Sequence, residues 1–321
     1  MKEMIREILR EEMMSRNAKT YYFMSGLPRA GSSLLSAILN QNPKFYSGPS
    51  SPVVPTMIAL EQSLANDELY LAYPKPAQGA KIISSVLENW YSDVSKPVII
   101  DKNRSWINRL HYIQGYFGIE PKVLCPVRSI DEILASFISM YRRNPYKGVG
   151  KLPFLDEMLV KSNIPLSDDN RCEMLCTPIG IVGASFNGLK QVFAEGKEKS
   201  VHLIEYNDLI NSPEETMRKI YDFLGETYFA HDFNKLENIH RERDSEIYGL
   251  ADMHEVRRTL NKVSINPQEV LSENILEKCK GSEFWRNMNM YEESSDSTEM
   301  KYLDDFDIPS KDLTDENKFI G

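Results

Sequence analysis

The chain has 321 residues, of which 41% are hydrophobic and 26% are charged, the composition of an ordinary globular protein. Its formal net charge is −9. Residues 292–321 hold ten Asp and Glu against three Lys, a contribution of −7 that leaves −2 for the rest of the chain. The body of the protein therefore lacks the strong positive field that favours a nucleic-acid partner. No stretch approaches the ~20 apolar residues of a membrane span, which predicts no membrane partner.

Three regions follow from the composition along the chain. Residues 1–18 are predicted to form a charged N-terminal helix with its apolar residues on one face. Residues 19–291 show no Pro/Gly/Ser-rich linker and no internal repeat, which indicates one large domain. Residues 292–321 form an acidic tail, which we expect to be solvated.

Short apolar runs alternate with helical patterns over most of this domain. The runs are typical of buried strands and lie at about 20–25, 97–101, 121–127 and 200–205. This alternation predicts an α/β fold, a P-loop-like three-layer sandwich with a central parallel sheet and helices on both faces. Helical insertions are predicted at about 53–93 and 150–195, where they overhang the carboxyl edge of the sheet. Some of their aromatic side chains are candidates to line an acceptor site, although most are expected in the core: Tyr70, Tyr73, Trp90, Tyr91 and Phe186.

The four cysteines form no C-x-x-C pair and have no metal-like partner among the five histidines, so we expect no metal. Cys125 lies in a predicted strand and suits a small buried position. Cys172 and Cys176 stand one helical turn apart, a spacing that allows a disulfide without demanding one.

The most informative stretch is the loop Phe-Met-Ser-Gly-Leu-Pro-Arg-Ala-Gly-Ser-Ser at 23–33. An apolar run precedes it and a helical pattern follows it, so the N–H groups at the helix start converge on one point and can hold a phosphate. The loop resembles the P-loop G-x-x-x-x-G-K-[ST], but Ser32 takes the lysine position and the cation is Arg29. A purely structural turn is the alternative.

Three further segments carry candidate ligands. A predicted strand ends at Arg128, and Ser136 follows eight residues later; a guanidinium and a hydroxyl suit a phosphate, although Arg128 could instead pair with Asp131 or Glu132. Tyr206 follows another strand, before a helix that Ser212 and Gly225 are expected to cap. Tyr206 could otherwise be a half-buried core residue. Lys102 closes the short strand at 97–101, where a solvated lysine is the ordinary alternative.

In this order, the four segments at about 20–225 resemble the PAPS-dependent sulfotransferases, PAPS being 3′-phosphoadenosine-5′-phosphosulfate. The Pro-Arg in the loop makes the chain more similar to the tyrosylprotein and bacterial types than to the cytosolic aryl types. The resemblance implies PAPS as donor and PAP as product. It also implies a 5′-phosphate site at Arg29, Ala30, Gly31, Ser32 and Ser33, a 3′-phosphate site at Arg128 and Ser136, an adenine contact at Tyr206, and a catalytic Lys102.

The general base does not carry over from the family. Tyrosylprotein sulfotransferases place a Glu where this chain has Gly48-Pro49-Ser50-Ser51, and cytosolic enzymes place a His where it has Arg104. Asp101, beside Lys102, is the candidate catalytic base, and His111 is a weaker one. A turn-capping role is the alternative for Asp101.

A late basic segment at 249–267 stands where the family folds over the cofactor. Arg257, Arg258 and Lys262 are therefore candidate ligands of the 3′-phosphate, and a solvated basic face is the alternative. If the segment is helical, Arg258 and Lys262 face the same way.

These patterns predict in-line transfer of a sulfuryl group from PAPS to an acceptor hydroxyl or amine, without a metal. Two alternatives stay open: a P-loop kinase of small molecules or nucleotides, and a non-catalytic protein that binds PAP or nucleotides. The acceptor is expected to be a small molecule, a glycan or a peptide. A homodimer is compatible with the sequence. Golgi members of the family carry a membrane span that this chain lacks, which predicts a cytoplasmic protein.

Overall fold

A computed structural model of the protein describes residues 19–238, 240, 242–260, 265–286 and 306. The predicted helix at 1–18, Lys262 and all of the predicted acidic tail except Phe306 lie outside the described residues. Among the described helices, none is long and apolar enough to cross a membrane.

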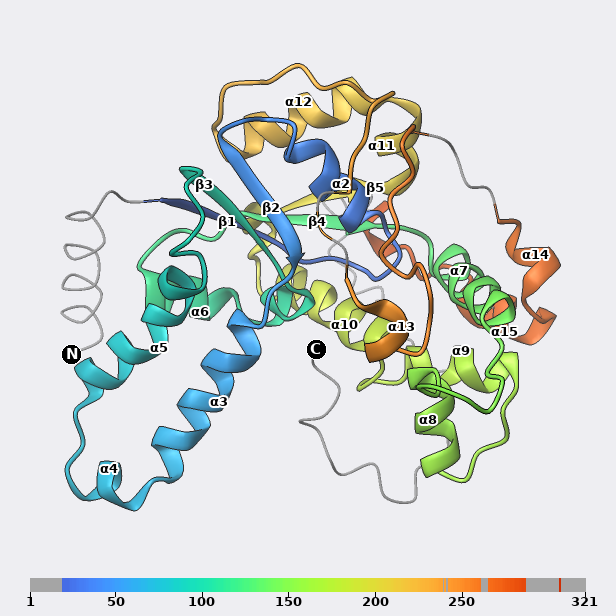
Figure 1. The fold of residues 1–321 in the computed structure, drawn as a ribbon, viewed down its shortest axis with the longest axis horizontal. Coiled ribbons are helices and arrows are strands. Elements are labelled where there is room, and N and C mark those ends of the chain that lie inside the picture. The colour runs from blue at the N-terminus through green and yellow to red at the C-terminus, as the bar shows by residue number, and fades with distance from the viewer. Residues whose placement is uncertain (1–18, 239, 241, 261–264, 287–305, 307–321) are drawn as a thin grey trace, which may run out of the picture.

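Five parallel strands form one sheet in the order β2-β3-β1-β4-β5 (Figure 1). They span Thr20–Met24 (β1), Phe45–Ser50 (β2), Val98–Lys102 (β3), Val123–Val127 (β4) and Val201–Glu205 (β5). The predicted parallel α/β sandwich is confirmed, and four strands lie within two residues of their predicted bounds. The sequence analysis missed β2 because Gly48 and Pro49 interrupt it. A proline donates no ladder hydrogen bond, which an edge strand tolerates.

Helices follow the strands and cover both faces of the sheet (Figure 1). The helices before β4 span Ser32–Leu39 (α2), Val53–Asn66 (α3), Glu68–Ala72 (α4), Pro76–Trp90 (α5), Arg104–Asn108 (the 3₁₀ helix η1) and Leu110–Phe117 (α6). Those between β4 and β5 span Ile130–Arg143 (α7), Phe154–Lys161 (α8), Asp168–Cys176 (α9), Ile181–Ala194 (α10) and Glu198–Ser200 (η2). Those after β5 span Tyr206–Asn211 (α11), Pro213–Leu224 (α12), Asp244–Ile247 (α13), Pro267–Val270 (α14), Glu273–Cys279 (α15) and Phe284–Arg286 (η3).

Side chains alternate between two cores along each strand. On β1, Tyr21 and Phe23 enter the larger core under α6, α7 and α10, whereas Tyr22 and Met24 enter the smaller core with α2 and α12. β3 follows the same alternation, with Ile99 in the larger core and Ile100 in the smaller one. The next two residues on β3, Asp101 and Lys102, therefore leave the strand toward opposite faces.

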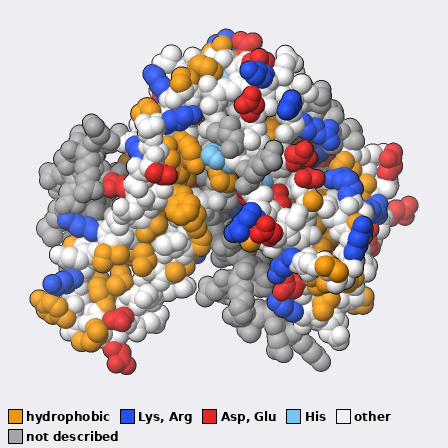
Figure 2. Space-filling model, viewed as in Figure 1, with side chains coloured by type: hydrophobic (Ala, Val, Ile, Leu, Met, Phe, Trp, Pro, Cys, Tyr) orange, Lys and Arg blue, Asp and Glu red, His pale blue; other side chains and the backbone are white. Residues whose placement is uncertain are grey.

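The predicted insertions are helical, and part of one is exposed. Leu69, Leu71 and Tyr73 are exposed on and beside α4, at the tip where Figure 2 shows hydrophobic side chains at the surface. By contrast, Phe306 is buried against the larger core with Lys278 over its ring, so this residue of the tail is docked rather than solvated.

Of the two predicted caps of α12, one is confirmed and one is corrected. Gly225 ends α12 in the left-handed conformation as expected, with φ 78°. Ser212 stands at the N-cap position of α12, but its side chain makes no capping hydrogen bond. No disulfide joins Cys172 and Cys176, which are buried thiols.

Candidate active site

The loop after β1 has the geometry of a phosphate cradle. Gly31, at φ 92°, is the N-cap of α2, and Arg29 also has a left-handed backbone, at φ 58°. A Cβ on Gly26 would lie 2.3 Å from the Pro126 carbonyl oxygen, so glycine is required where the loop passes the end of β4. The first N–H groups of α2 therefore point into the space beyond the sheet edge, where an anion is favoured.

Hydrogen bonds fix the end of β3 beside this loop. The Ser51 N–H donates to the Lys102 carbonyl at 2.8 Å, and the Asn103 N–H donates to the Met24 carbonyl at 3.0 Å. The Ser25 hydroxyl donates to the Arg104 carbonyl at 2.6 Å, joining the loop to η1. Lys102 is thereby held near the loop although the two lie far apart in the sequence.

The end of β4 brings the other predicted phosphate ligands to the same place. Arg128 lies with its guanidinium carbon 4.4 Å from the centroid of the Tyr206 ring. Its Nε is 3.3 Å from Glu132 Oε2. Arg128 therefore forms the ion pair that was the alternative prediction and also lines the cavity. Arg29 donates through Nε to the Ser136 hydroxyl at 3.2 Å and through Nη1 to the Met253 carbonyl.

These residues line one cavity of about 590 Å³ at the carboxyl edge of the sheet, a volume typical of ligand pockets. Its described walls contain two carboxylates, Asp252 and Glu255. They contain six cationic side chains, Arg29, Lys102, Arg104, Arg128, Arg143 and Arg257. A polyanion would neutralise this excess of positive charge.

Burial, with a smaller contribution from neighbouring cations, lowers the pKa of two of these side chains. Burial, then the charges of Arg128 and Arg143, lower the pKa of Arg29. Burial lowers the pKa of Lys102 to about 8, and the carboxylate of Glu242 opposes that shift. A bound anion would stabilise the charged forms of these side chains.

Sequence analysis missed two of these cations. Arg143 stands two helical turns after Ser136 on α7, so the i, i+7 spacing was the available signal. Arg104 was noted only as the residue that replaces a family histidine. It lines the cavity because η1 turns the chain at the end of β3.

Asp101 is unsuited to act as the general base. It is fully buried in the larger core, where Tyr91 donates to Oδ2 at 2.7 Å and Trp106 donates to Oδ1 at 2.5 Å. Burial raises its pKa, and these hydrogen bonds oppose the rise. Since its neighbour Lys102 takes the other side of the strand, Asp101 anchors the core beneath the site instead of facing the cavity.

The late basic segment lies over the cavity but is not helical over the described residues 251–260. Arg257 lines the cavity, whereas Arg258 is exposed and does not. The segment is tied to the domain because the Leu236 N–H donates to the Arg258 carbonyl at 2.7 Å and the Ala251 N–H donates to Asn144 Oδ1 at 3.1 Å.

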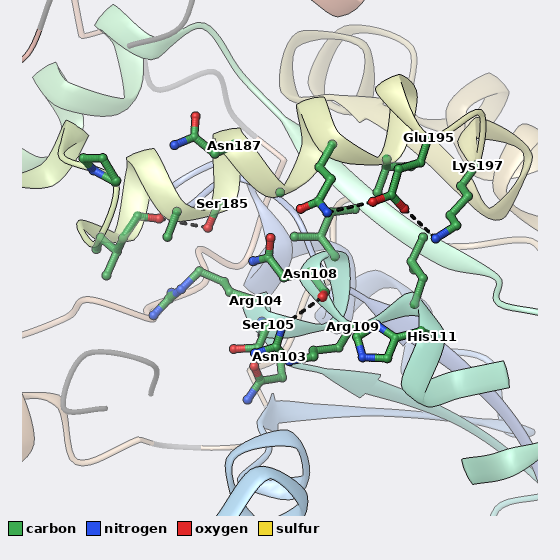
Figure 3. A pocket seen from close by; sticks show the side chains of 18 of the residues that line it. Asn103, Arg104, Ser105, Asn108, Arg109, His111, Ser185, Asn187, Glu195 and Lys197 are labelled. Atoms are coloured by element: carbon green, nitrogen blue, oxygen red, sulfur yellow. Dashed lines mark hydrogen bonds and ion pairs between the residues drawn. The ribbon is translucent and has the colours of Figure 1, made fainter. Parts of the chain in front are cut away.

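A second cavity, of about 600 Å³, runs as a groove between η1 and α10 and shares Arg104 with the first (Figure 3). Arg104 extends toward one end of this groove, and His111, Glu195 and Lys197 lie at the other (Figure 3). Its lining is polar and apolar in similar measure, and the Oδ1 of Asn187 is buried without a partner among the described residues. The aromatic residues proposed for an acceptor site line neither cavity.

The fold and the cavity define an α/β protein with a cation-lined cavity at the carboxyl edge of a parallel sheet. A family model described as the sulfotransferase domain matches residues 19–242, more than two thirds of the chain. The chain therefore belongs to the sulfotransferase family.

Among solved structures, the chain is similar to three bacterial sulfotransferases or sulfotransferase domains. The domain from the Synechococcus PCC 7002 olefin synthase is 17% identical, with 72% of this chain and 80% of that chain covered and a TM-score of 0.42. The domain from the curacin biosynthetic pathway is 14% identical, with 94% and 95% covered and a TM-score of 0.45. The sulfotransferase from Alicyclobacillus acidocaldarius is 17% identical, with 71% and 88% covered and a TM-score of 0.43. A search of curated proteins gave no match.

Proposed function

We propose that the protein transfers a sulfuryl group from PAPS to a hydroxyl or amine of a polar acceptor. The observation that carries this proposal is the single cavity in which Arg29, Lys102, Arg128, Ser136 and Tyr206 meet. PAPS would supply an activated sulfuryl group, and the residues present fit its phosphates because cations and the N–H groups at the start of α2 line the same cavity.

Each residue has a role that follows from its place. The N–H groups from Ala30 to Ser33 and the Arg29 guanidinium would hold the 5′-phosphate. Arg128 and Ser136 would hold the 3′-phosphate, with the adenine near Tyr206. Lys102 would stabilise the negative charge that builds on the bridging oxygen as the sulfur bond breaks. These groups are preorganised, since Lys102 and Arg128 are buried.

The 3′-phosphate assignment gives the first prediction. PAP is expected to bind much more tightly than AMP, and Arg128→Ala is expected to weaken PAP binding by roughly tenfold to a hundredfold, because a charge-assisted contact contributes about 1.5–3 kcal/mol. AMP binding should change far less. Isothermal titration of the unmodified protein and of Arg128→Ala with PAP, AMP and ATP measures these affinities.

Arg218→Ala is the matched control, since Arg218 is an exposed arginine that pairs with Glu214 on α12. Equal affinities of the unmodified protein for PAP and AMP would contradict the proposed donor, and tighter binding of ATP would favour a kinase.

The groove between η1 and α10 is proposed as the acceptor site, because Arg104 joins it to the donor cavity. Its amides and cations, among them Asn108 and Arg109, favour a hydroxylated or acidic acceptor over a flat aromatic one. Ala184→Trp, on α10, is expected to obstruct the groove and raise the acceptor KM by tenfold or more, while PAP affinity stays unchanged. Radiolabelled sulfate transfer to a panel of sugars, alcohols, phenols and peptides tests it; an unchanged acceptor KM would move the acceptor elsewhere.

A further inference from the structure

Three side chains absent from the predicted site converge at the edge of the donor cavity. The Nδ1 of His254 is 2.7 Å from Asp244 Oδ1 and 3.3 Å from Glu242 Oε2. The backbone N–H of His254 also donates to Asp244 Oδ2, at 2.9 Å. Both oxygens of the buried Asp244 therefore contact His254, one at the ring and one at the backbone. These contacts hold the imidazole in one orientation.

This histidine stands beside the predicted catalytic lysine. Both His254 and Lys102 line the donor cavity, and both also line a small recess next to it that includes Ser33 and Gly48. The side chain of His254 is 16% exposed, which gives it access to a substrate. The recess contains Gly48, in the stretch where tyrosylprotein sulfotransferases were expected to place their glutamate.

The partners of the ring determine its chemistry. A carboxylate only accepts hydrogen bonds, so Nδ1, which faces Asp244 and Glu242, carries the proton in the neutral ring. The other nitrogen, Nε2, then has the basic lone pair. Among the described residues, no hydrogen bond to Nε2 is present, and His254 lines the donor cavity.

We propose that His254 is the general base that deprotonates the acceptor, and that Asp244 is the residue that positions it. This inference rests on the proposed function. As the acceptor oxygen bonds the sulfur, its proton passes to Nε2 of His254. The bond from sulfur to the bridging phosphate oxygen breaks at the same time, and that oxygen keeps the electron pair beside Lys102. The products are the sulfated acceptor, PAP and a proton that His254 returns to water.

Contacts of the segment after α13 explain how His254, late in the chain, reaches the donor cavity. α13 is followed by a turn in which Gly249 has a left-handed backbone, at φ 69°. A Cβ on Gly249 would lie 2.6 Å from the Lys151 carbonyl oxygen, so the turn is pressed against the stretch before α8. The carbonyl of Met253, the residue before His254, accepts a hydrogen bond from Arg29. The same segment thus contacts the phosphate loop and carries the base.

His254→Gln is expected to lower kcat/KM by roughly 10²–10⁴-fold, the usual contribution of general base catalysis, with PAP affinity changed less than about threefold. The measured quantity is PAP formation from PAPS, with water or the best acceptor of a panel. Asp244→Asn should lower kcat less, because it loosens the ring while Glu242 still faces Nδ1 and favours the proton there. His202→Gln is the matched control, since His202 lies on β5 with its ring stacked on Phe223 at 5.2 Å between centroids.

A pH profile and chemical rescue separate catalysis from a structural role. In His254→Gln the acidic limb of kcat/KM should disappear, and in His254→Ala added imidazole should restore part of the rate without changing thermal stability. The titratable groups that face His254 are Glu242, Asp244, Tyr248, Lys102, Glu237 and His240. Retention of the acidic limb in His254→Gln would assign it to one of these and overturn the inference.

The remaining outcomes are also decisive. Wild-type kcat/KM in His254→Gln, alongside active transfer by the unmodified protein, would overturn the role of His254 and leave the proposed function intact. Equal binding of PAP and AMP would instead overturn the proposed function itself. Loss of activity in a chelator and its return with Zn²⁺ would show that the cluster holds a metal, which also overturns the inference.

Discussion

Lys102→Met is expected to lower kcat by roughly 10²–10³-fold, the effect of removing one preorganised donor from a developing negative charge. Methionine keeps most of the side-chain volume, so the fold and PAP binding should suffer much less than the rate. Sulfate transfer and PAP titration on the same protein measure the two effects. Lys219→Met is the matched control because Lys219 is exposed on α12 and pairs with Glu215.

The lysine also predicts a pH dependence. Burial lowers the pKa of Lys102 to about 8, so the free enzyme loses the catalytic charge as the pH rises through that value. kcat/KM, which reports the free enzyme, should fall above about pH 8. The bound polyanion favours the charged lysine, so the corresponding fall in kcat should occur at a higher pH. In Lys102→Arg the residual activity should not fall in this range, because arginine stays protonated. The role of Lys102 would be contradicted if the unmodified protein and Lys102→Arg lost kcat/KM over the same pH range, or if Lys102→Met were fully active.

The sequence predicted those parts of the site that a single segment determines. The loop at 23–33 contains its own glycines, and Arg128 and Ser136 are placed by one strand and the helix that follows it. Parallel strands bring such segments to one edge of the sheet, so four of them could be assembled without coordinates. The missed strand β2 had no apolar run to reveal it.

The base could not be found in this way, for two physical reasons. Asp101 was attractive because it adjoins Lys102, but strand alternation sends neighbours to opposite faces and buries Asp101 beneath Tyr91 and Trp106. His254 has no regular spacing to Lys102, since it reaches the cavity through a non-repeating turn held by tertiary contacts.

Gly26→Ala is expected to destabilise the fold by about 3 kcal/mol, the cost of inserting a methyl group where the backbone cannot yield. The added Cβ would lie 2.3 Å from the Pro126 carbonyl oxygen and 2.7 Å from its nitrogen, both of which are main-chain atoms of β4. That carbonyl also accepts from the Leu27 N–H at 2.9 Å, so moving it would break the bond that holds the phosphate loop to the sheet.

Urea unfolding of Gly26→Ala and Gly115→Ala tests this geometry. Gly115 lies within α6, and an added Cβ would meet no atom within 4 Å outside its neighbours and the backbone of its own helix, so alanine there should stabilise the protein by roughly 0.5–1 kcal/mol through helix propensity. PAP should raise the stability of Gly115→Ala as much as it raises that of the unmodified protein, because binding stabilises only the folded state. It should add less to Gly26→Ala, whose displaced loop can no longer present its N–H groups together. Equal stability of the two variants would mean that the loop does not pass β4 at this distance, and the phosphate cradle would lose its structural basis.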